Sequence, residues 1–193
     1  LPICWLRSRP NHPSAVRPRP LTLNVWEAVY FDHNLEKLTQ LADVAQSIGV
    51  ERFVLDDGWF GARRDDHKGL GDWVVSKDVW PNGLKPLIDV VKSRGMEFGL
   101  WFEGEMVNPD SDLYRAHPEW ILHVGDRVPP EGRFQQVLDI THPGAYAHVF
   151  AQVDAILSEY DIAYIKWDHN RTLTEAAHLG QAAVREQTKA IYR

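Results

Sequence analysis

The segment Lys166-Trp167-Asp168 brings three side chains of different chemistry to the end of one short apolar run, Ile162-Ala163-Tyr164-Ile165. A lysine ammonium beside a carboxylate favours the ionised form of that carboxylate. An indole offers a flat apolar face of the kind that packs against a sugar ring. An ionised carboxylate in this setting can act as the nucleophile in the cleavage of a glycosidic bond. A buried ion pair that closes a strand is an equally good interpretation of this segment taken alone.

Three earlier apolar runs end in the same way, in tryptophan and carboxylate side chains: Trp26-Glu27, Asp56-Asp57-Gly58-Trp59 and Trp101-Phe102-Glu103. The adjacent Asp56 and Asp57 repel each other unless they bind something, and vicinal sugar hydroxyls are suitable hydrogen-bond donors. A divalent metal site and a simple strand-end turn are the two alternatives for this pair. No histidine or further carboxylate stands at a recognised ligand spacing to support the metal.

The elements that position these residues alternate between strand and helix. Apolar residues three and four positions apart predict helices, and glycine commonly follows a helix end, as Gly49 and Gly95 do here. The predicted strands cover residues 21–28, 52–56, 97–102 and 162–167, and the predicted helices cover 35–48, 83–93, 142–160 and a stretch from 181 onward. An insertion is predicted between 103 and 141, with a short helix at 111–116 and a hairpin that pairs 120–124 with 136–140.

Strands that alternate with helices indicate an α/β fold with parallel strands and right-handed crossovers. The strands form continuous apolar runs, which is typical of a sheet covered on both faces. An open doubly wound sheet is one alternative, but no glycine-rich phosphate loop follows the first strand. Polar residues at the carboxyl end of every strand favour a (β/α)₈ TIM-type barrel, which has its active site on that face. The chain is expected to supply about the first four β/α units.

The bulk composition is that of a soluble globular protein, with 193 residues, 44% hydrophobic residues and a formal charge of −6. The mild charge gives no indication of nucleic-acid binding, and no apolar run is long enough to cross a membrane. The single cysteine, Cys4, excludes an intrachain disulfide and predicts a cytoplasmic location. Residues 1–20 are expected to be a linker or the end of a preceding region. Because the chain starts at Leu1 and stops within a helical pattern, we expect residues 21–193 to be the first half of a longer barrel domain.

The sequence closely resembles the catalytic barrel of the family 36 glycoside hydrolases, the α-galactosidases related to raffinose- and melibiose-degrading enzymes. The resemblance runs from about Arg19 to the end of the chain. It rests on an ordered set of motifs: Leu23-Asn24-Val25-Trp26-Glu27-Ala28, Phe53-Val54-Leu55-Asp56-Asp57-Gly58-Trp59-Phe60-Gly61, Leu70-Gly71-Asp72-Trp73, Pro81-Asn82-Gly83-Leu84, Phe98-Gly99-Leu100-Trp101-Phe102-Glu103, Ser111-Asp112-Leu113-Tyr114-Arg115-Ala116-His117-Pro118 and Tyr164-Ile165-Lys166-Trp167-Asp168.

The resemblance implies a role for seven residues. Asp168 is the expected nucleophile, and the residues expected to bind galactose are Trp26, Asp56, Asp57, Trp101, Arg133 and Lys166. Two positions depart from the family pattern, since Gly104 stands where proline is expected and Phe134 stands where a polar residue is usual. No cofactor and no metal are expected. The expected partner is an α-galactoside oligosaccharide, with no nucleic acid or membrane, and the full-length protein is a candidate homo-oligomer.

The mechanism that the resemblance implies is a retaining double displacement in which the acid/base is an aspartate from a later strand, beyond this chain. Glu103 and Glu105 are expected to be structural. We therefore expect the isolated chain to hydrolyse ordinary α-galactosides negligibly. Alternatives on the same barrel are a galactosyl transferase of the raffinose-synthase type and an α-N-acetylgalactosaminidase. A non-catalytic galactose-binding fragment and, more distantly, a metal-dependent phosphotransferase are alternatives of other classes.

Overall fold

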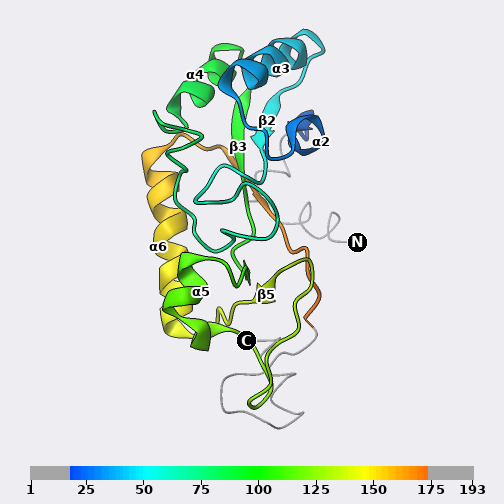
Figure 1. Ribbon diagram of the computed structural model, residues 1–193. Helices are drawn as coiled ribbons and strands as arrows, with labels where there is room; N and C mark the ends of the chain where they lie inside the picture. The colour runs from blue at the N-terminus through cyan, green and yellow to red at the C-terminus, as the bar shows by residue number, and fades with distance from the viewer. Residues whose placement is uncertain (1–17, 174–193) are drawn as a thin grey trace.

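Strands and helices alternate through residues 18–173, the part of the chain that the computed structural model describes (Figure 1). This confirms the α/β class expected from the sequence. The elements, in chain order, are β1 (Thr22–Asn24), α2 (Trp26–Val29), α3 (Leu35–Ser47), β2 (Arg52–Leu55), α4 (Lys85–Ser93), β3 (Glu97–Phe102), β4 (Met106–Val107), α5 (Asp112–Ala116), the 3₁₀ helix η2 (Pro118–Trp120), β5 (Gln136–Val137), α6 (Pro143–Glu159) and β6 (Tyr164–Trp167).

The main sheet has four strands in the order β1-β2-β3-β6, and all neighbouring pairs are parallel. Each strand lies beside the one that precedes it in this sheet, so the order never reverses. A doubly wound sheet reverses its strand order near the middle. The observed order therefore fits a sheet that winds in one direction only.

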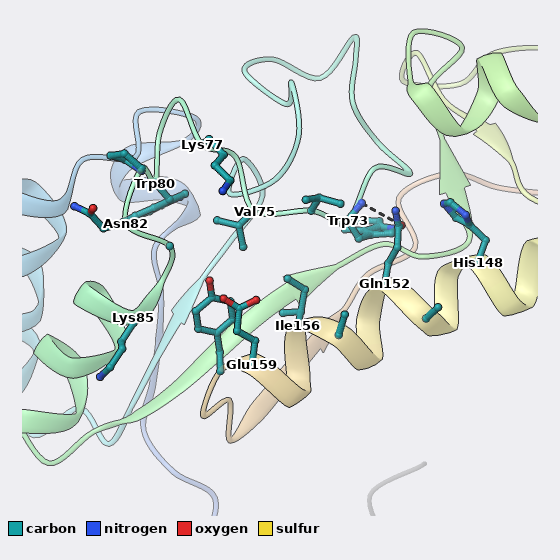
Figure 2. Close-up of a pocket in the computed structure, with 16 residues that line it drawn as sticks. Trp73, Val75, Lys77, Trp80, Asn82, Lys85, His148, Gln152, Ile156 and Glu159 are labelled. Atoms are coloured by element: carbon teal, nitrogen blue, oxygen red, sulfur yellow. Dashed lines mark hydrogen bonds between the residues drawn. The ribbon is translucent and has the colours of Figure 1, made fainter.

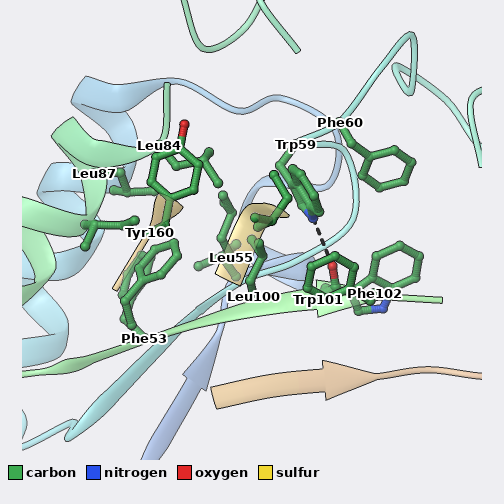
Figure 3. Close-up of a cluster of buried hydrophobic side chains, with 14 of the residues drawn as sticks. Phe53, Leu55, Trp59, Phe60, Leu84, Leu87, Leu100, Trp101, Phe102 and Tyr160 are labelled. Atoms are coloured by element: carbon green, nitrogen blue, oxygen red, sulfur yellow. Dashed lines mark hydrogen bonds between the residues drawn. The ribbon is translucent and has the colours of Figure 1, made fainter. Parts of the chain in front are cut away.

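One face of this sheet is apolar and is covered by helices. Alternate strand residues point to the same face, and Phe53, Leu55, Phe98 and Leu100 belong to one buried cluster together with residues of α3 and α4 (Figure 3). The residues that the two helices contribute are Leu38, Ala42, Ala45, Leu87, Ile88 and Val91. Burial of these side chains is the main force that fixes the strands in place.

The opposite face carries polar side chains. Arg52 lies opposite Glu97 in the register and bonds it at 2.6 Å, and the Arg52 guanidinium lies 4.3 Å from the centre of the Tyr164 ring. Toward the carboxyl ends of the strands this face is buried as well, with Val54 1% and Trp101 2% exposed. The apolar runs expected for β2 and β3 are therefore observed, and β6 adds Lys166 to this face.

The first predicted strand, 21–28, is too long at its carboxyl end. The strand stops at Asn24, and the Val25 N–H makes one more bond to the Val54 carbonyl, at 3.1 Å. The Val25 carbonyl then accepts from the N–H groups of Ala28 and Val29. These bonds turn the backbone into the short helix α2, which begins at Trp26.

The predicted hairpin of 120–124 with 136–140 is only partly correct. Strand β5 (Gln136–Val137) pairs antiparallel with β4 (Met106–Val107), whereas the predicted partner contributes a single bridge, from Ile121 to Leu138. Trp120 itself lies in η2, where Pro118 occupies the first turn, a position that proline tolerates because no N–H is needed there. The insertion thus pairs its two ends, since β4 lies shortly after β3 and β5 lies shortly before α6.

The remaining predicted helices and strands are observed within a few residues of the expected bounds. The helix predicted from 181 onward, and most of the linker predicted at 1–20, lie outside the described residues. No helix among residues 18–173 is long and apolar enough to cross a membrane.

An aromatic cluster closes the carboxyl end of the sheet. The loop between β2 and α4 folds over this end, and its side chains pack on those of β3; the cluster consists of Trp59, Phe60, Trp73, Trp101 and Phe102. The Trp59 indole N–H also donates to the Trp101 carbonyl at 2.9 Å. This cluster fixes the ends of the strands from which the polar residues project.

We predict that Leu100→Ala lowers the free energy of unfolding by about 2–5 kcal/mol, because the side chain is fully buried and its removal leaves a cavity. Leu21→Ala is the matched control: this side chain is 54% exposed, and we expect a change below about 0.5 kcal/mol. Urea unfolding followed by tryptophan fluorescence measures both. Equal effects of the two substitutions would contradict the assignment of this face as the core.

Candidate active site

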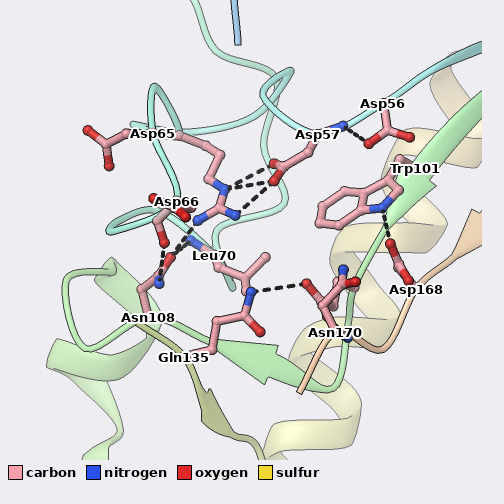
Figure 4. Close-up of polar contacts among 12 residues, drawn as sticks. Asp56, Asp57, Asp65, Asp66, Leu70, Trp101, Asn108, Gln135, Asp168 and Asn170 are labelled. Atoms are coloured by element: carbon pink, nitrogen blue, oxygen red, sulfur yellow. Dashed lines mark hydrogen bonds and ion pairs between the residues drawn. The ribbon is translucent and has the colours of Figure 1, made fainter. Parts of the chain in front are cut away.

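The carboxyl ends of β2, β3 and β6 bring Asp56, Asp57, Trp101, Glu103 and Asp168 together (Figure 4). All three strands are parallel, so their ends meet at the same edge of the sheet. Five acidic or aromatic side chains that are far apart in the sequence therefore share one region.

Asp168 follows β6 directly, and its N–H donates to the Phe102 carbonyl at 2.8 Å. Its Oδ2 accepts from the Trp101 indole N–H at 3.0 Å, and its Oδ1 accepts from the His169 N–H at 3.0 Å. Burial raises the pKa of Asp168, but hydrogen bonds from Trp101, Asn170 and His169 outweigh burial and hold the pKa below its usual range. The nearby Lys166 ammonium acts in the same direction. Asp168 is therefore an ionised carboxylate with a fixed orientation.

Lys166 reaches across β3 to Asp56, and its Nζ lies 2.7 Å from Oδ2. The Lys166 position is paired with Trp101, one strand away from β2. The Asp56 side chain is only 5% exposed, and its other oxygen accepts from the Asp57 N–H at 2.8 Å. The lysine of the Lys-Trp-Asp segment thus pairs with a carboxylate from another strand, and the structure places it near Asp168 as well.

Asp57 is held by Arg63, a residue to which the sequence analysis gave no role. The guanidinium donates to both carboxylate oxygens, with Nη2 at 2.8 Å from Oδ2 and Nε at 3.0 Å from Oδ1. Burial raises the pKa of Asp57, and the Arg63 guanidinium opposes that shift. Arg63 is 2% exposed and also donates to the Asn108 side chain at 3.0 Å. The only sequence signal for it was an arginine in the loop just after the two aspartates.

Gly69 explains how the loop can hold Arg63 so closely. Its φ is +79°, and a Cβ at this position would lie 2.8 Å from the backbone nitrogen of Arg63. A side chain there would collide with backbone, which cannot move aside easily. The glycine lets two parts of the loop approach each other and bury the guanidinium.

Glu103 lies beside Asp168 at the end of β3 and is fully buried. Its carboxylate accepts from the Asn170 N–H and, at 3.3 Å, from the Gln135 side-chain amide. Burial raises the pKa of Glu103, hydrogen bonds from Asn170 lower it, and the charges of Asp168 and Asp57 raise it further.

The two tryptophans expected to line a sugar pocket, Trp26 and Trp101, differ in their exposure. Trp101 is 2% exposed, so it presents its indole N–H to Asp168 but no open face. Trp26 is half-buried at the start of α2, edge-on to Tyr30 and Phe31. The Phe31 ring in turn lies 5.5 Å below the Arg63 guanidinium, which connects Trp26 to the Asp57 side of the site.

Arg133 lies at the tip of a tight turn, and its side chain is exposed. Gly132 and Gln135 exchange two backbone hydrogen bonds at 3.0 Å, and both central residues are left-handed, Arg133 with φ 54° and Phe134 with φ 59°. Two left-handed central residues define a type I′ turn, which usually contains glycine or asparagine. The Asn108 amide, which also contacts Arg63, donates to the Phe134 carbonyl at 2.7 Å.

Both aspartates of the Asp56-Asp57 pair are neutralised by protein cations, Lys166 and Arg63. Within residues 18–173, no group of three or more histidine, cysteine, aspartate or glutamate side chains is arranged to hold a metal ion. The geometry therefore favours hydrogen bonding to a neutral polar ligand over metal binding at this pair.

A groove of about 730 Å³ lies elsewhere, between the loop before α4 and one face of α6 (Figure 2). None of Asp56, Asp57 and Asp168 lines it. Trp73 and Trp80 form part of its wall, but they are 1% and 4% exposed and offer no open ring face.

His33 lies behind the Asp56-Asp57 turn. It is 8% exposed, its ring centre is 6.0 Å from that of Trp80, and a Cβ on Gly58 would lie 3.4 Å from the imidazole. Burial lowers the pKa of His33 from 6.5 to about 4, and the charge of Arg64 adds to this effect, while Asp56 opposes it. The ring is therefore neutral at pH 7.

Taken together, the site offers one oriented, ionised carboxylate beside an ammonium and a second carboxylate pair. Such an arrangement can bind a hydroxyl-rich ligand through Asp56, Asp57 and Lys166 and attack it with Asp168.

Comparison with known proteins places this geometry among related enzymes. Residues 5–193 match the family described as Melibiase. The chain is 49% identical over 175 residues to an α-galactosidase of Escherichia coli, covering 91% of this chain and 25% of that protein. The chain therefore spans about a quarter of the length of the curated relatives that it matches.

Two solved structures show the same fold. The GH36 α-galactosidase AgaB of Geobacillus stearothermophilus superposes with a TM-score of 0.89 at 44% identity, covering 96% of this chain and 26% of that one. A variant of AgaA from the same organism, in complex with raffinose, gives a TM-score of 0.88 at 43% identity, with the same coverage of 96% and 26%.

We predict that Lys166→Met lowers the free energy of unfolding by about 2 kcal/mol, because it leaves the buried Asp56 carboxylate without its ammonium partner. Adding Asp56→Asn should restore most of the loss, and a double-mutant cycle by urea unfolding measures the coupling. The exposed pair Lys37–Asp32 is the control, with 49% and 73% side-chain exposure and an expected coupling below about 0.5 kcal/mol. Additive effects at Lys166 and Asp56 would refute the pairing.

We also predict a pH dependence of stability that arises from His33. Between pH 6.5 and pH 4 the unfolded state binds a proton at this ring while the folded state does not, so stability falls as the pH falls through this window. The loss due to this group is about 3 kcal/mol at pH 4 relative to pH 7. In His33→Phe the same titration by urea unfolding should be shallower by that amount. An identical slope in His33→Phe and the wild type would contradict the buried neutral state.

Proposed function

Because the chain belongs to the melibiase family of α-galactosidases, we propose that it carries the nucleophile and part of the sugar-binding surface of a retaining α-galactosidase. Its relatives are glycoside hydrolases by name. The observation that carries the proposal is the state of Asp168, an ionised and oriented carboxylate at a strand end, beside the Lys166–Asp56 pair.

We propose that residues 21–193 belong to a (β/α)₈ barrel, to which they contribute about the first four β/α units. Three features support this. The strand order follows the chain without reversal, the helices cover one face only, and the polar face carries Arg52, Glu97, Lys166 and Asp168. In a barrel, this polar face lines the interior and its carboxyl end forms the active site.

In the proposed reaction, a carboxylate oxygen of Asp168 attacks the anomeric carbon of an α-galactoside. A C–O ester bond forms, the glycosidic C–O bond breaks, and an acid delivers a proton to the departing oxygen. In the second step, water attacks the same carbon and gives a proton to the conjugate base of that acid. The ester C–O bond breaks, which releases Asp168 as a carboxylate. The indole N–H of Trp101 keeps one oxygen of Asp168 in place throughout.

The sugar hydroxyls are proposed to bind Asp56, Asp57 and Lys166. Each carboxylate oxygen has a second lone pair, so the contacts to Lys166 and Arg63 leave acceptors for hydroxyl groups. Trp26 is proposed to line the rim of the pocket, Trp101 its floor, and Arg133 to reach the ligand from its turn. The exposure of Arg133 leaves its side chain available for this contact.

The general acid is proposed to come from outside the described residues. Asp56, Asp57 and Glu103 each have a partner already, namely Lys166, Arg63 and the Asn170 N–H. Each of these carboxyl groups is thus already engaged by the protein, so none of them is free to deliver a proton to the departing oxygen.

The proposed substrates are oligosaccharides with a terminal α-linked galactose, of the melibiose and raffinose type. Support comes from relatives whose structures contain raffinose and stachyose. A cytoplasmic location is proposed from the single cysteine in 193 residues.

We predict that an activated 2-deoxy-2-fluoro-α-galactoside forms a covalent ester on Asp168. The good leaving group removes the need for an acid, and the fluorine slows hydrolysis of the ester, so the adduct accumulates. Intact-mass spectrometry and peptide mapping of the 193-residue chain detect and place it.

The controls separate chemistry from binding. Asp168→Asn should give no adduct, and the reagent with glucose configuration should label more slowly than its galactose counterpart. An adduct on another residue, or equal labelling of Asp168→Asn, would contradict the assigned nucleophile. A thermal shift with galactose but no adduct would indicate a galactose-binding fragment without catalysis.

A further inference from the structure

Glu103 is a buried charged residue for which the proposed reaction has no use. It is fully buried at the end of β3, next to the strand that leads to Asp168. Burial raises its pKa, and so do the charges of Asp168 and Asp57. Burying a carboxylate here costs free energy, and only hydrogen bonds that an apolar side chain of similar size cannot make offset this cost.

Glu103 accepts the last of three hydrogen bonds that begin at the proposed nucleophile, Asp168. The Asp168 N–H is bonded to the Phe102 carbonyl, and this is the last contact between the backbones of β3 and β6. The next N–H, of His169, is bonded to the Asp168 side chain itself. The one after it, of Asn170, is bonded to Glu103. Three consecutive backbone donors are thus satisfied, and the third depends on Glu103.

This third bond determines where the chain goes after Asp168. Because the His169 N–H orients one oxygen of Asp168, a change in the backbone at 169–170 would rotate the carboxylate away from the Trp101 indole. The side chain of Asn170 also contacts both Asp168 and Glu103. Glu103 therefore acts on Asp168 through the backbone and through this amide.

The other carboxylate oxygen of Glu103 contacts the insertion that lies between β3 and α6. Its Oε2 accepts from the Gln135 amide, and Gln135 is the last residue of the turn that carries Arg133. One carboxylate thus ties the segment after the nucleophile to the segment with the proposed sugar-binding arginine.

We propose that Glu103 is a positioning residue that holds the backbone of residues 168–170 and so aims the Asp168 carboxylate at the anomeric carbon. This inference rests on the proposed function for its catalytic consequence, whereas the clamp on the Asn170 N–H can be tested without any reaction.

The structure provides a loss variant and a rescue variant. Glu103→Met fills the same volume and removes the acceptor, so the protein should remain folded while the Asn170 N–H loses its partner. Glu103→Gln keeps one acceptor oxygen for Asn170. Its new amide can donate to Gln135 Oε1, which has no partner among residues 18–173, once the Gln135 amide turns over.

Glu105→Gln is the matched control. Glu105 lies two residues away on the same segment. It accepts from the exposed Trp167 indole at 3.1 Å and lies 3.5 Å from Nδ1 of His169, and glutamine keeps an acceptor oxygen for the indole.

The first measurement is amide hydrogen exchange in the segment 168–173, followed by mass spectrometry. Exchange should be at least about tenfold faster in Glu103→Met than in wild type, and close to wild type in Glu103→Gln and Glu105→Gln. Unchanged exchange in Glu103→Met would overturn the clamp.

The second measurement is labelling by the activated 2-fluorogalactoside, with the maximal rate separated from the concentration that gives half of it. Because a misaimed carboxylate slows the bond-forming step, Glu103→Met should lower the maximal rate about 100-fold with little change in the half-saturating concentration. Glu103→Gln should recover most of the rate. Equal maximal rates in Glu103→Met and wild type would overturn the positioning role.

The two proposals can fail separately. If the wild-type chain forms no adduct, the proposed function fails, and hydrogen exchange still decides whether Glu103 holds the Asn170 N–H. If the wild type is labelled and Glu103→Met is labelled equally fast, the function stands and the positioning role is wrong.

Discussion

The hydrogen bond from the Trp101 indole to Asp168 is the interaction on which the rest of the site depends. The Trp101 ring is buried among Phe60, Trp73 and other aromatic side chains, and the Trp59 indole holds its carbonyl. The core of the protein therefore ends in a donor that points at the proposed nucleophile, Asp168. Packing of the aromatic side chains fixes the Trp101 ring, and the ring in turn fixes the orientation of the Asp168 carboxylate.

The sequence predicted the ends of β2, β3 and β6 well, but not that of β1. Parallel strands in an α/β fold place their carboxyl ends on one side whatever the loops do. Asp56, Asp57 and Asp168 follow apolar runs, and that pattern is visible without any structure. Arg63 and Asn108 could not be found in this way, since they lie in loops whose course depends on glycines such as Gly69 and on contacts 45 residues apart. The β4–β5 pairing was missed for a similar reason: strands of two residues carry no periodicity.

The acidic residues of the site show how a protein keeps several carboxylates in one place. Asp56 is paired with a lysine, Asp57 with an arginine, and Asp168 with N–H donors that carry no charge. Of these three aspartates, only Asp168 has no hydrogen bond to a lysine or arginine, so its oxygens are not held by a cation, while the N–H donors keep its pKa low. Asp168 thus differs from Asp56 and Asp57 both in its partners and in its greater exposure.

The turn at Arg133 and Phe134 has a consequence for how this surface can change over evolutionary time. The Asn108 amide holds the backbone of this turn, because it donates to the Phe134 carbonyl. This contact does not involve the Phe134 side chain. Phe134 is 42% exposed and rests on the His67 ring, so its identity can drift without disturbing the guanidinium that Asn108 also contacts. The side chain at position 134 can therefore change while Asn108 keeps both of its contacts, the one to the turn and the one to Arg63.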